Sequence, residues 1–364
     1  MTDKNNAISK TPPKAIGVAL CLIAGVFLLF FAISRRLNSM DVYAAGFEKD
    51  DQGRCIATVW KNGDVHWRLS NGDYDAYANF IFSSGDDDVY VAGWEDSAQG
   101  NWVAMVWKNG DAHWRLTDGK YDAGADSMFV SGDDAYIVGR ENDAQGKCIA
   151  TVWKNGDVHW RLGDENYAYA NSIFVSGDDA YIAGWESNSY GNRGAAVWKN
   201  GDIHWRLTDG RRDAYASSLF VSGMDVYAAG YECNDQGKRI ATVWKNGNVH
   251  WRLKDGKYDA CAESIFVSGK DVYATGRENS DKDKRNDVAT VWKNGDVHWR
   301  LSNGDYDAYA NYLFVSGDNV YVGGNEYNAQ GNWVAMVWKN GDAHWQFKDG
   351  NRHVEARSVF IKKR

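Results

Sequence analysis

Apolar and polar residues alternate on both sides of an Asn-Gly pair at regular intervals along this chain. In Val59–Leu69, which reads VWKNGDVHWRL, the two alternating runs flank Asn62-Gly63. Asparagine and glycine both accept the positive φ angles of a type I′ turn, so the phrase predicts a two-residue β-hairpin. No stretch of the repeated region shows a helical period of 3.6 residues, which indicates an all-β domain.

The hairpin phrase recurs. Successive copies lie 45 to 48 residues apart. In the second copy, Val89–Ala92 predicts a strand before the hairpin, ended by Gly93, and Met128–Val130 predicts a strand after it. Four short strands in a unit of about 46 residues are typical of a propeller blade. The tetrapeptide Trp-Lys-Asn-Gly begins at Trp60, Trp107, Trp153, Trp198, Trp244, Trp292 and Trp338.

The two ends of the repeated region complement each other. The first copy starts at its second strand, within Asp41–Leu69, and the chain ends in a lone segment of the missing type, Ser358–Ile361. Joining the two gives seven complete units and leaves no open ring edge. The sequence therefore predicts a closed seven-bladed β-propeller over residues 40–364.

Pairing across the two-residue turn predicts the faces of the hairpin. If alternation is unbroken, Trp60 and Trp67 lie on one face, as an aromatic plate suited to packing on the next blade. Lys61 and Asp64 would form a cross-strand ion pair. The expected pairs are Lys61 with Asp64, Trp60 with Val65, Val59 with His66, and Thr58 with Trp67.

Histidine and glutamate recur once per unit, which favours a structural role. Catalytic groups must meet within hydrogen-bond reach, and seven copies spread around a ring cannot converge on one substrate. We expect the glutamates to form ion pairs at joints or at the rim. The histidines are His66, His113, His159, His204, His250, His298 and His344. The glutamates are Glu48, Glu95, Glu141, Glu186, Glu232, Glu278 and Glu326.

The unit resembles a kelch repeat. Six residues separate Trp60 from Trp67, as they separate the aromatic and the Trp of a kelch unit, and Tyr43 precedes Gly46 as in the kelch second strand. The third-strand aromatic is Trp where kelch has Tyr, and the glycine pair is complete only at Gly323-Gly324. The unit is also similar to those of uncharacterised bacterial repeat proteins with the VWKNG phrase, a resemblance that implies no function.

The segment that leads into the innermost strand of each blade varies between copies. In kelch-like geometry these segments converge at one mouth of the central channel. Tyrosine rings, amides and carboxylates there suit sugar hydroxyls or a peptide. The alternative is that the tyrosines only pack between blades. The predicted ligand-binding residues are Tyr77, Asn79, Asp126, Tyr169, Asn171, Tyr215, Ser217, Glu263, Tyr309, Asn311 and Arg357.

Ala15–Ser34 is a run of twenty mostly apolar residues, long enough to span a bilayer. The predicted arrangement is a cytoplasmic tail at residues 1–14, a transmembrane signal-anchor at residues 15–34 and an exported propeller in the periplasm or outside the cell. The lysines before the span favour this orientation. A cleaved signal peptide is the alternative, because Ala32-Ile33-Ser34 could serve as a cleavage site.

The net charge and the motif content limit the classes of function that the protein can have. The net charge of −8 offers no basic face to nucleic acid. Cys55 and Cys148 share a repeat position with Arg239, which argues against an essential disulfide or metal role. The sequence shows no nucleophile–base pair, no phosphate loop and no Cys/His metal cluster. We therefore expect neither a cofactor nor a metal.

Three functions fit these patterns. The first is a membrane-anchored, non-catalytic protein whose propeller mouth binds a protein, peptide or glycan. The second is a glycosidase or lyase that uses mouth carboxylates, with Asp126 and Glu263 as candidates. Glycosidase pairs lie roughly 5 to 9.5 Å apart, and these two come from distant blade junctions, so we expect them to be too far apart. The third is a purely structural module of the cell envelope.

Overall fold

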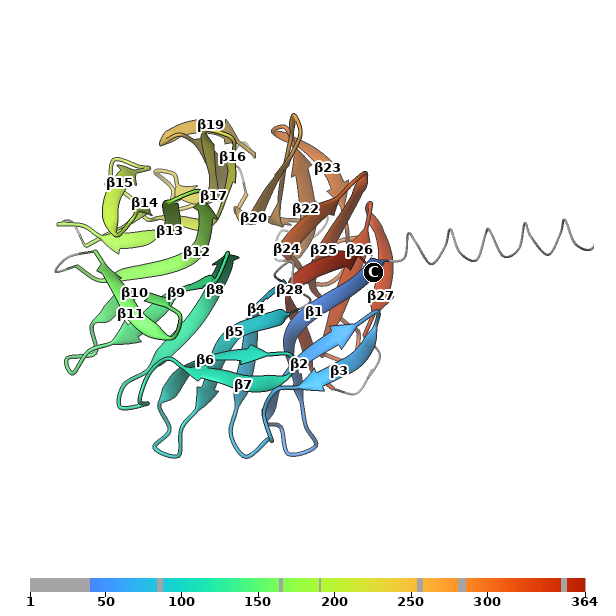
Figure 1. Ribbon diagram of the computed structural model, residues 1–364. Helices are drawn as coiled ribbons and strands as arrows, with labels where there is room; N and C mark the ends of the chain where they lie inside the picture. The colour runs from blue at the N-terminus through green and yellow to red at the C-terminus, as the bar shows by residue number, and fades with distance from the viewer. Residues whose placement is uncertain are drawn as a thin grey trace, which may run out of the picture. The chain divides into compact units, whose positions relative to one another are not determined.

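The computed structural model describes residues 40–83, 88–163, 166–189, 191–253, 258–280, 286–347 and 352–363. The chain divides into two units, Met1–Asp41 with Lys362–Arg364, and Val42–Ile361. The second unit is a seven-bladed β-propeller of four-stranded blades (Figure 1). The predicted membrane segment, Ala15–Ser34, lies outside the described residues. Within the described ranges, no helix is long and apolar enough to cross a membrane.

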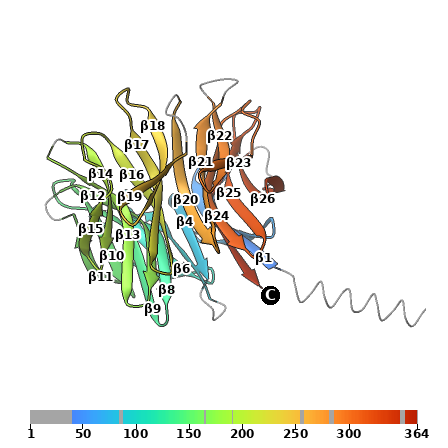
Figure 2. The ribbon, with the colours of Figure 1, turned by 90° about the horizontal axis from the view of Figure 1, so that it is seen from above.

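Each blade is an antiparallel sheet whose strands follow chain order from the channel outward, except in blade 1. Figure 2 shows the same blades turned by 90° about the horizontal axis from the view of Figure 1. Blade 1 contains β28 (Val354–Lys363), β1 (Met40–Lys49), β2 (Cys55–Lys61) and β3 (Asp64–Arg68). Blade 2 contains β4 (Ala76–Ser83), β5 (Val89–Asp96), β6 (Trp102–Lys108) and β7 (Asp111–Arg115). Blade 3 contains β8 (Ala123–Ser131), β9 (Asp134–Asn142), β10 (Cys148–Lys154) and β11 (Asp157–Leu162).

The remaining blades repeat this order. Blade 4 contains β12 (Ala168–Ser176), β13 (Asp179–Ser187), β14 (Arg193–Lys199) and β15 (Asp202–Arg206). Blade 5 contains β16 (Ala214–Ser222), β17 (Asp225–Cys233), β18 (Arg239–Lys245) and β19 (Asn248–Arg252). Blade 6 contains β20 (Ala260–Ser268), β21 (Asp271–Asn279), β22 (Asp287–Lys293) and β23 (Asp296–Arg300). Blade 7 contains β24 (Ala308–Ser316), β25 (Asn319–Tyr327), β26 (Trp333–Lys339) and β27 (Asp342–Gln346).

The last strand of the chain completes the first blade, which confirms the predicted closure. β28 lies next to β1 as the innermost strand of blade 1. Its Ser358 is fully buried, and the Ser358 hydroxyl accepts a hydrogen bond of 3.3 Å from the backbone N–H of Ile81 in blade 2. The innermost strand of blade 1 therefore holds the neighbouring blade as well as its own.

The Asn-Gly turn has the predicted conformation in all seven copies. Asn62 has a φ of 53° and Gly63 a φ of 92°, and the other six asparagines have φ between 50° and 54°. The asparagine side chain adds a second function. In blade 2, Asn109 donates its backbone N–H to the Val89 carbonyl, and its Oδ1 accepts the Val89 N–H, both at 2.9 Å. The turn is thereby tied to the start of the second strand.

The predicted hairpin register is correct for its first two pairs and wrong beyond them. Lys61 pairs with Asp64 and Trp60 with Val65, but a β-bulge follows, so that Trp67 pairs with Val59. His66 is the extra residue. Directly opposed residues share a face, so the bulge places Trp67 on the Val59 face and Trp60 on the other. The single aromatic plate predicted from alternation is therefore wrong.

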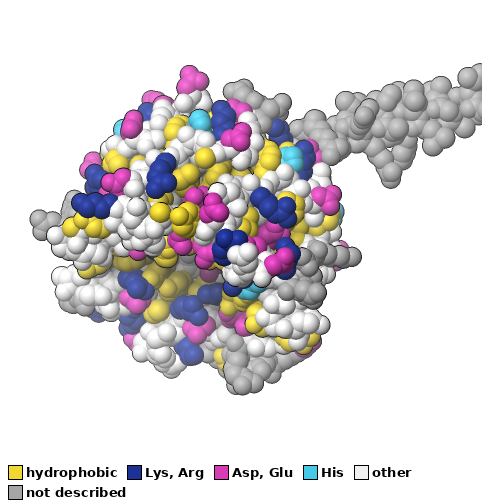
Figure 3. Space-filling view, turned by 90° about the horizontal axis from the view of Figure 1, so that it is seen from below, with side chains coloured by type: hydrophobic (Ala, Val, Ile, Leu, Met, Phe, Trp, Pro, Cys, Tyr) yellow, Lys and Arg dark blue, Asp and Glu magenta, His cyan; other side chains and the backbone are white. Residues whose placement is uncertain are grey.

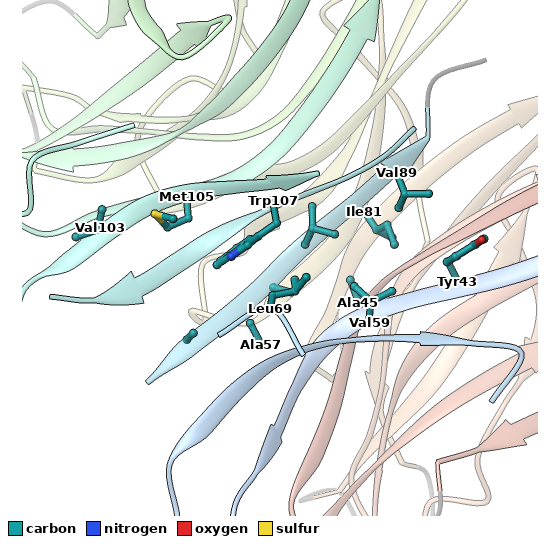
Figure 4. Close-up of a cluster of buried hydrophobic side chains, with 13 residues drawn as sticks. Tyr43, Ala45, Ala57, Val59, Leu69, Ile81, Val89, Val103, Met105 and Trp107 are labelled. Carbon is teal, nitrogen blue, oxygen red and sulfur yellow. The ribbon is translucent and has the colours of Figure 1, made fainter. Parts of the chain in front are cut away.

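Each tryptophan of the phrase instead contacts a different neighbouring blade. Trp107 of blade 2 is 1% exposed and packs on blade 1 against Val59 and Leu69 (Figure 4). Trp67 of blade 1 covers the hairpin turn of blade 2, where a Cβ on Gly110 would lie 2.8 Å from its Cδ1. The sequence motif recurs because each blade packs one of its two tryptophans on the preceding blade and the other on the following blade.

The predicted ion pair across the hairpin is also replaced. Lysines at the repeat position of Lys61 contact the aspartate that begins or precedes the second strand of their own blade. These ion pairs measure 2.7 to 2.8 Å and join Lys108 to Asp88, Lys154 to Asp134, Lys199 to Asp179, Lys245 to Asp225, and Lys293 to Asp271.

Candidate functional site at the mouth of the channel

In blades 2 to 7, a β-bulge near the start of the innermost strand shapes the mouth of the channel. In blade 2, Ala78 pairs with Gly93 and Phe80 with Ala92, so Asn79 is left as the extra residue. A Cβ on Gly93 would lie 1.9 Å from the Tyr77 carbonyl oxygen, so only glycine fits there. β5 accordingly runs through Gly93 to Asp96, and the predicted end of this strand at Gly93 is wrong.

The bulge recurs in blades 2 to 7, and its extra residues are predicted site residues. They are Asn79, Asp126, Asn171, Ser217, Glu263 and Asn311. The predicted tyrosines stand two residues earlier, at Tyr77, Tyr169, Tyr215 and Tyr309, and like Arg357 they are partly exposed. All eleven predicted residues therefore lie at the same end of the channel. Their binding of a ligand stays a prediction.

Asparagines at the bulge position tie adjacent blades together. The Nδ2 of Asn79, Asn171 and Asn311 donates to the carbonyl of Ala125, Ala216 and Ala356 at 2.9 to 3.0 Å, in each case on the following blade. Arg357 donates to Asn79 Oδ1 at 2.6 Å. These residues thus hold the ring together as well as lining its mouth.

A second layer of mouth residues was missed by the sequence reasoning. It occupies two repeat positions, the one after the second-strand glycine and the one that begins the third strand. Both positions vary while their flanking residues repeat, and that variation was the available signal. The first set is Phe47, Trp94, Arg140, Trp185, Tyr231, Arg277 and Asn325. The second set is Cys55, Trp102, Cys148, Arg193, Arg239, Asp287 and Trp333.

Rings and guanidinium groups of this layer stack on one another. Tyr77 and Trp94 have centroids 4.2 Å apart, and Trp94 and Trp102 have centroids 4.6 Å apart, with 24° between the planes in both pairs. The Arg140 guanidinium lies 4.8 Å from the Trp102 ring and 5.2 Å from the Tyr169 ring. Cation–π contacts of this kind are favourable when partly desolvated. We name these stacked residues, with the predicted tyrosines, the mouth collar.

The mouth collar opens into a pocket of about 430 Å³ beside blades 4 to 7. Five of the predicted residues line it, namely Asn171, Tyr215, Ser217, Glu263 and Asn311. Four residues that were not predicted complete it, namely Tyr231, Arg239, Cys261 and Arg277. A volume of this size is within the usual range of small-ligand sites. Ser217 and Cys261 are smaller than the Asn and Tyr found in other blades, and the pocket lies where they stand.

A second, smaller pocket of about 320 Å³ adjoins it. Its lining residues are Tyr309, Asn311, Asn325, Trp333, Glu355 and Arg357. Asn311 belongs to both pockets, so the two are neighbours along the mouth.

Phenylalanines line the channel beyond the mouth. One lies near the far end of each innermost strand, and neighbouring rings have centroids 4.6 to 6.1 Å apart. Phe80 and Tyr312 reach across blade 1 and meet edge to face at 5.3 Å. The space left is about 150 Å³ and apolar. The seven phenylalanines are Phe82, Phe129, Phe174, Phe220, Phe266, Phe314 and Phe360.

Asp126 is a carboxylate in an unusual setting. Burial raises the pKa of the Asp126 carboxyl to about 6, while a hydrogen bond from Tyr169 and the charge of Arg140 oppose this rise. Asn79 Nδ2 lies 3.2 Å from Oδ1, whereas Oδ2 is buried without a hydrogen-bond partner. Asp126 is not among the residues lining the 430 Å³ pocket, which contains Glu263.

The repeated histidines and glutamates lie away from this site. His159 is exposed on the outermost strand of blade 3, edge to face with Tyr136. Partial burial and the charge of Lys154 lower the pKa of His159. Glutamates pair with outer-strand arginines as expected, in the pairs Arg68–Glu48, Arg161–Glu141, Arg206–Glu186, Arg252–Glu232 and Arg300–Glu278, at 2.6 to 2.9 Å. In the described part of the chain, no group of three His, Cys, Asp or Glu could hold a metal ion.

Comparisons with known proteins concern the fold. No family model matches the chain, and no curated protein matches it. Among solved structures, it is similar to the WD40 β-propeller domain of Doa1, with a TM-score of 0.44 and 11% identity over 79% of this chain and 92% of that one. The β-propeller domain of the trilobed protease from Pyrococcus furiosus gives a TM-score of 0.38 and 11% identity over 76% and 97% of the chains.

A mutant of Trypanosoma rangeli sialidase that displays trans-sialidase activity gives a TM-score of 0.42 and 11% identity. The alignment covers 86% of this chain and 54% of the sialidase, so the present chain spans about half the length of that protein. At such low identity these likenesses bear on the architecture alone.

Proposed function

We propose that this protein is a non-catalytic binding protein whose ligand occupies the 430 Å³ pocket at the propeller mouth. One observation carries the proposal: the pocket lies where mouth residues differ from the commonest residue of their repeat position, at Ser217, Cys261 and Glu263. Tyrosine, tryptophan and arginine, the main residue types of the collar, are also those that contribute most binding energy at protein surfaces.

Binding is favoured over glycoside hydrolysis by the content of the pocket. Among the described residues that line it, Glu263 is the single carboxylate. Hydrolysis by the usual mechanisms needs two carboxylates about 5 to 9.5 Å apart. Asp126, the other candidate, instead contacts Asn79 and Tyr169. This arrangement supports recognition of a polar ligand without cleavage.

We also propose that a membrane anchor tethers the propeller and that its repeat units are kelch-like blades. Ala15–Ser34 has the length and apolar character of a signal-anchor, which would present the propeller outside the cytoplasm. The separation of Trp60 from Trp67 and the second-strand glycines support classing the units as kelch-like blades. In this view the blades are the scaffold and the variable mouth residues carry the specificity.

A pocket-filling substitution tests the binding proposal. Ser217→Trp would fill the pocket, while Ser222→Trp places the same residue at the other end of β16. Binding of the purified propeller to a panel of neutral and acidic oligosaccharides and short peptides is measured by glycan and peptide array. We expect Ser217→Trp to abolish binding and Ser222→Trp to retain it, with similar melting temperatures. Equal binding by both variants would rule out the pocket, and no binding by the wild-type protein would favour the purely structural alternative.

A further inference from the structure

Two arginines of the mouth pocket have unused hydrogen-bond donors. Arg239 and Arg277 both line the pocket, and their side chains are 34% and 24% exposed. Within the described ranges, neither guanidinium donates a hydrogen bond to another residue, and Arg277 Nε is buried without a partner. By contrast, Arg252 and Arg300 donate to glutamates at 2.7 and 2.9 Å. The two pocket arginines therefore lack the acceptors that the outer-strand arginines have.

The nearest carboxylates do not supply those acceptors. Asp259 lies 3.8 Å from Arg239 and Asp287 lies 3.5 Å from Arg277, both too long for a good hydrogen bond. Asp259 Oδ1 already accepts the Arg239 backbone N–H at 2.8 Å, and Asp287 Oδ1 accepts Asn279 Nδ2 at 3.0 Å. The buried Arg277 Nε costs free energy without an acceptor. The exposed part of each guanidinium can donate to a ligand oxygen in the pocket.

A tyrosine ring lies beside each guanidinium at the pocket wall. Arg277 lies 4.5 Å from the Tyr309 ring and Arg239 lies 5.9 Å from the Tyr231 ring. A guanidinium group is planar and carries its N–H donors along its edges. Planar forks of this kind match the geometry of a carboxylate.

The rest of the pocket suits a hydroxyl-rich ring. Ser217, Asn171 and Glu263 offer a hydroxyl, an amide and a carboxylate, which together donate and accept hydrogen bonds. Tyr215 and Tyr231 stack at 5.0 Å and add aromatic surface. Asn171 Nδ2 donates to the Ala216 carbonyl at 2.9 Å, so the amide keeps one N–H and its Oδ1 for a ligand.

Charge on the surface at large does not favour anions. Acidic and basic side chains are interspersed on the face drawn in Figure 3, without a broad basic area. The whole chain carries a net charge of −8. Attraction for a negative ligand must therefore come from local groups such as Arg239 and Arg277.

We propose that the mouth pocket recognises a sugar acid, a saccharide unit that carries a carboxylate. Arg239 and Arg277 bind the carboxylate, and Glu263, Ser217 and Asn171 bind ring hydroxyls. This inference rests on the proposed function of the same pocket and names its ligand class.

The test compares acidic and neutral oligosaccharides of matched size. Binding of trigalacturonic acid, its methyl ester and neutral galactotriose to the purified propeller is measured by calorimetry, together with a hexaglutamate peptide. Arg239→Met, Arg277→Met and Arg277→Lys are compared with Arg252→Met, which removes an outer-strand arginine. Melting temperatures identify variants that lose the fold, and Arg277→Met/Asp287→Asn replaces Arg277→Met if that variant unfolds.

We expect trigalacturonic acid to bind most tightly and to lose about tenfold to hundredfold in affinity in each Met variant. Arg252→Met should bind like the wild-type protein, and Arg277→Lys should retain part of the affinity. Equal binding of the methyl ester or of galactotriose would overturn the assignment of the acid but leave the binding proposal intact. Tighter binding of hexaglutamate, or no binding of trigalacturonic acid, would overturn the sugar-acid assignment.

Discussion

The aromatic ring of Phe82, on the innermost strand of blade 2, lies 6.1 Å from that of Phe360, on the last strand of the chain. This contact completes the circle of seven phenylalanines around the channel. Residues 278 positions apart in sequence thus meet in the same apolar layer. Closure of the ring depends on the C-terminal strand in two ways, through the sheet of blade 1 and through this aromatic circle.

Removal of the closing strand should open the ring. Deletion of Ser358–Arg364 takes away buried Ser358, Val359 and Ile361 and leaves most of β1 as an unpaired edge. We expect size-exclusion chromatography to show oligomers or aggregates and the cooperative thermal transition to be lost. Phe360→Leu, which keeps the strand, serves as control and should cost about 1 kcal/mol. A monomeric deletion variant with unchanged melting would refute the closure.

Two glycine substitutions, one at the bulge and one as a control, test the geometry of the bulge. Gly93→Ala places a Cβ 1.9 Å from the Tyr77 carbonyl oxygen, so the bulge must shift. The free energy of unfolding should fall by about 1 to 3 kcal/mol, as measured by urea denaturation. Gly124→Ala is the matched control, because its Cβ would lie 3.5 Å from Trp94 Cδ1, in ordinary contact. Equal effects of the two substitutions would contradict the assignment of Gly93 to the bulge.

Asp126 should make stability depend on pH. Its folded-state pKa is raised to about 6, above the ordinary value of about 3.9, so ionisation of Asp126 destabilises the fold. The free energy by which ionised Asp126 destabilises the fold is zero below about pH 4, grows between pH 4 and pH 6, and reaches its full value above pH 6. It amounts to at most about 3 kcal/mol. Asp126→Asn should therefore melt at a higher temperature than the wild-type protein at pH 7.5 and at a similar temperature at pH 4. Parallel pH profiles would exclude this role.

The histidine of the repeated phrase should be dispensable for binding. His159 is exposed on an outer strand and contacts Tyr136 and Trp160 rather than the mouth. His159→Gln should leave array binding unchanged and shift the melting temperature by only a few degrees. Loss of all binding by a folded variant would mean that the outer strand takes part in recognition.

The topology of the tether is tested on intact spheroplasts. If Ala15–Ser34 is an anchor with a cytoplasmic N-terminus, protease added to bacterial spheroplasts should digest the propeller and spare the N-terminal tail. Lysed spheroplasts provide the control, in which both parts are accessible. A propeller that survives until lysis would place it in the cytoplasm instead.

The sequence repeat made the architecture predictable. The β-bulges limited the prediction of which face each side chain lies on. Seven Asn-Gly turns and a lone terminal strand were enough to predict blades, their number and their closure. Alternation failed at His66, because one extra residue in a strand moves every later side chain to the other face. The residues of the mouth pocket were predicted only in part. Tyr215 and Glu263 lie in a visibly variable segment. Arg239 and Arg277 stand instead at single variable positions on the third and second strands of their blades, and the pairing of Cys261 with Arg277 brings Arg277 to the pocket.

Hydrogen-exchange mass spectrometry with the tightest-binding compound of the panel tests the central claim that the mouth pocket is the ligand site. We expect slower exchange at the mouth ends of β16 and β20, around Tyr215–Ser218 and Cys261–Ser264, and little change at Ser222 or in the outermost strands. Protection confined to the outermost strands, or to the opposite end of the channel, would contradict it.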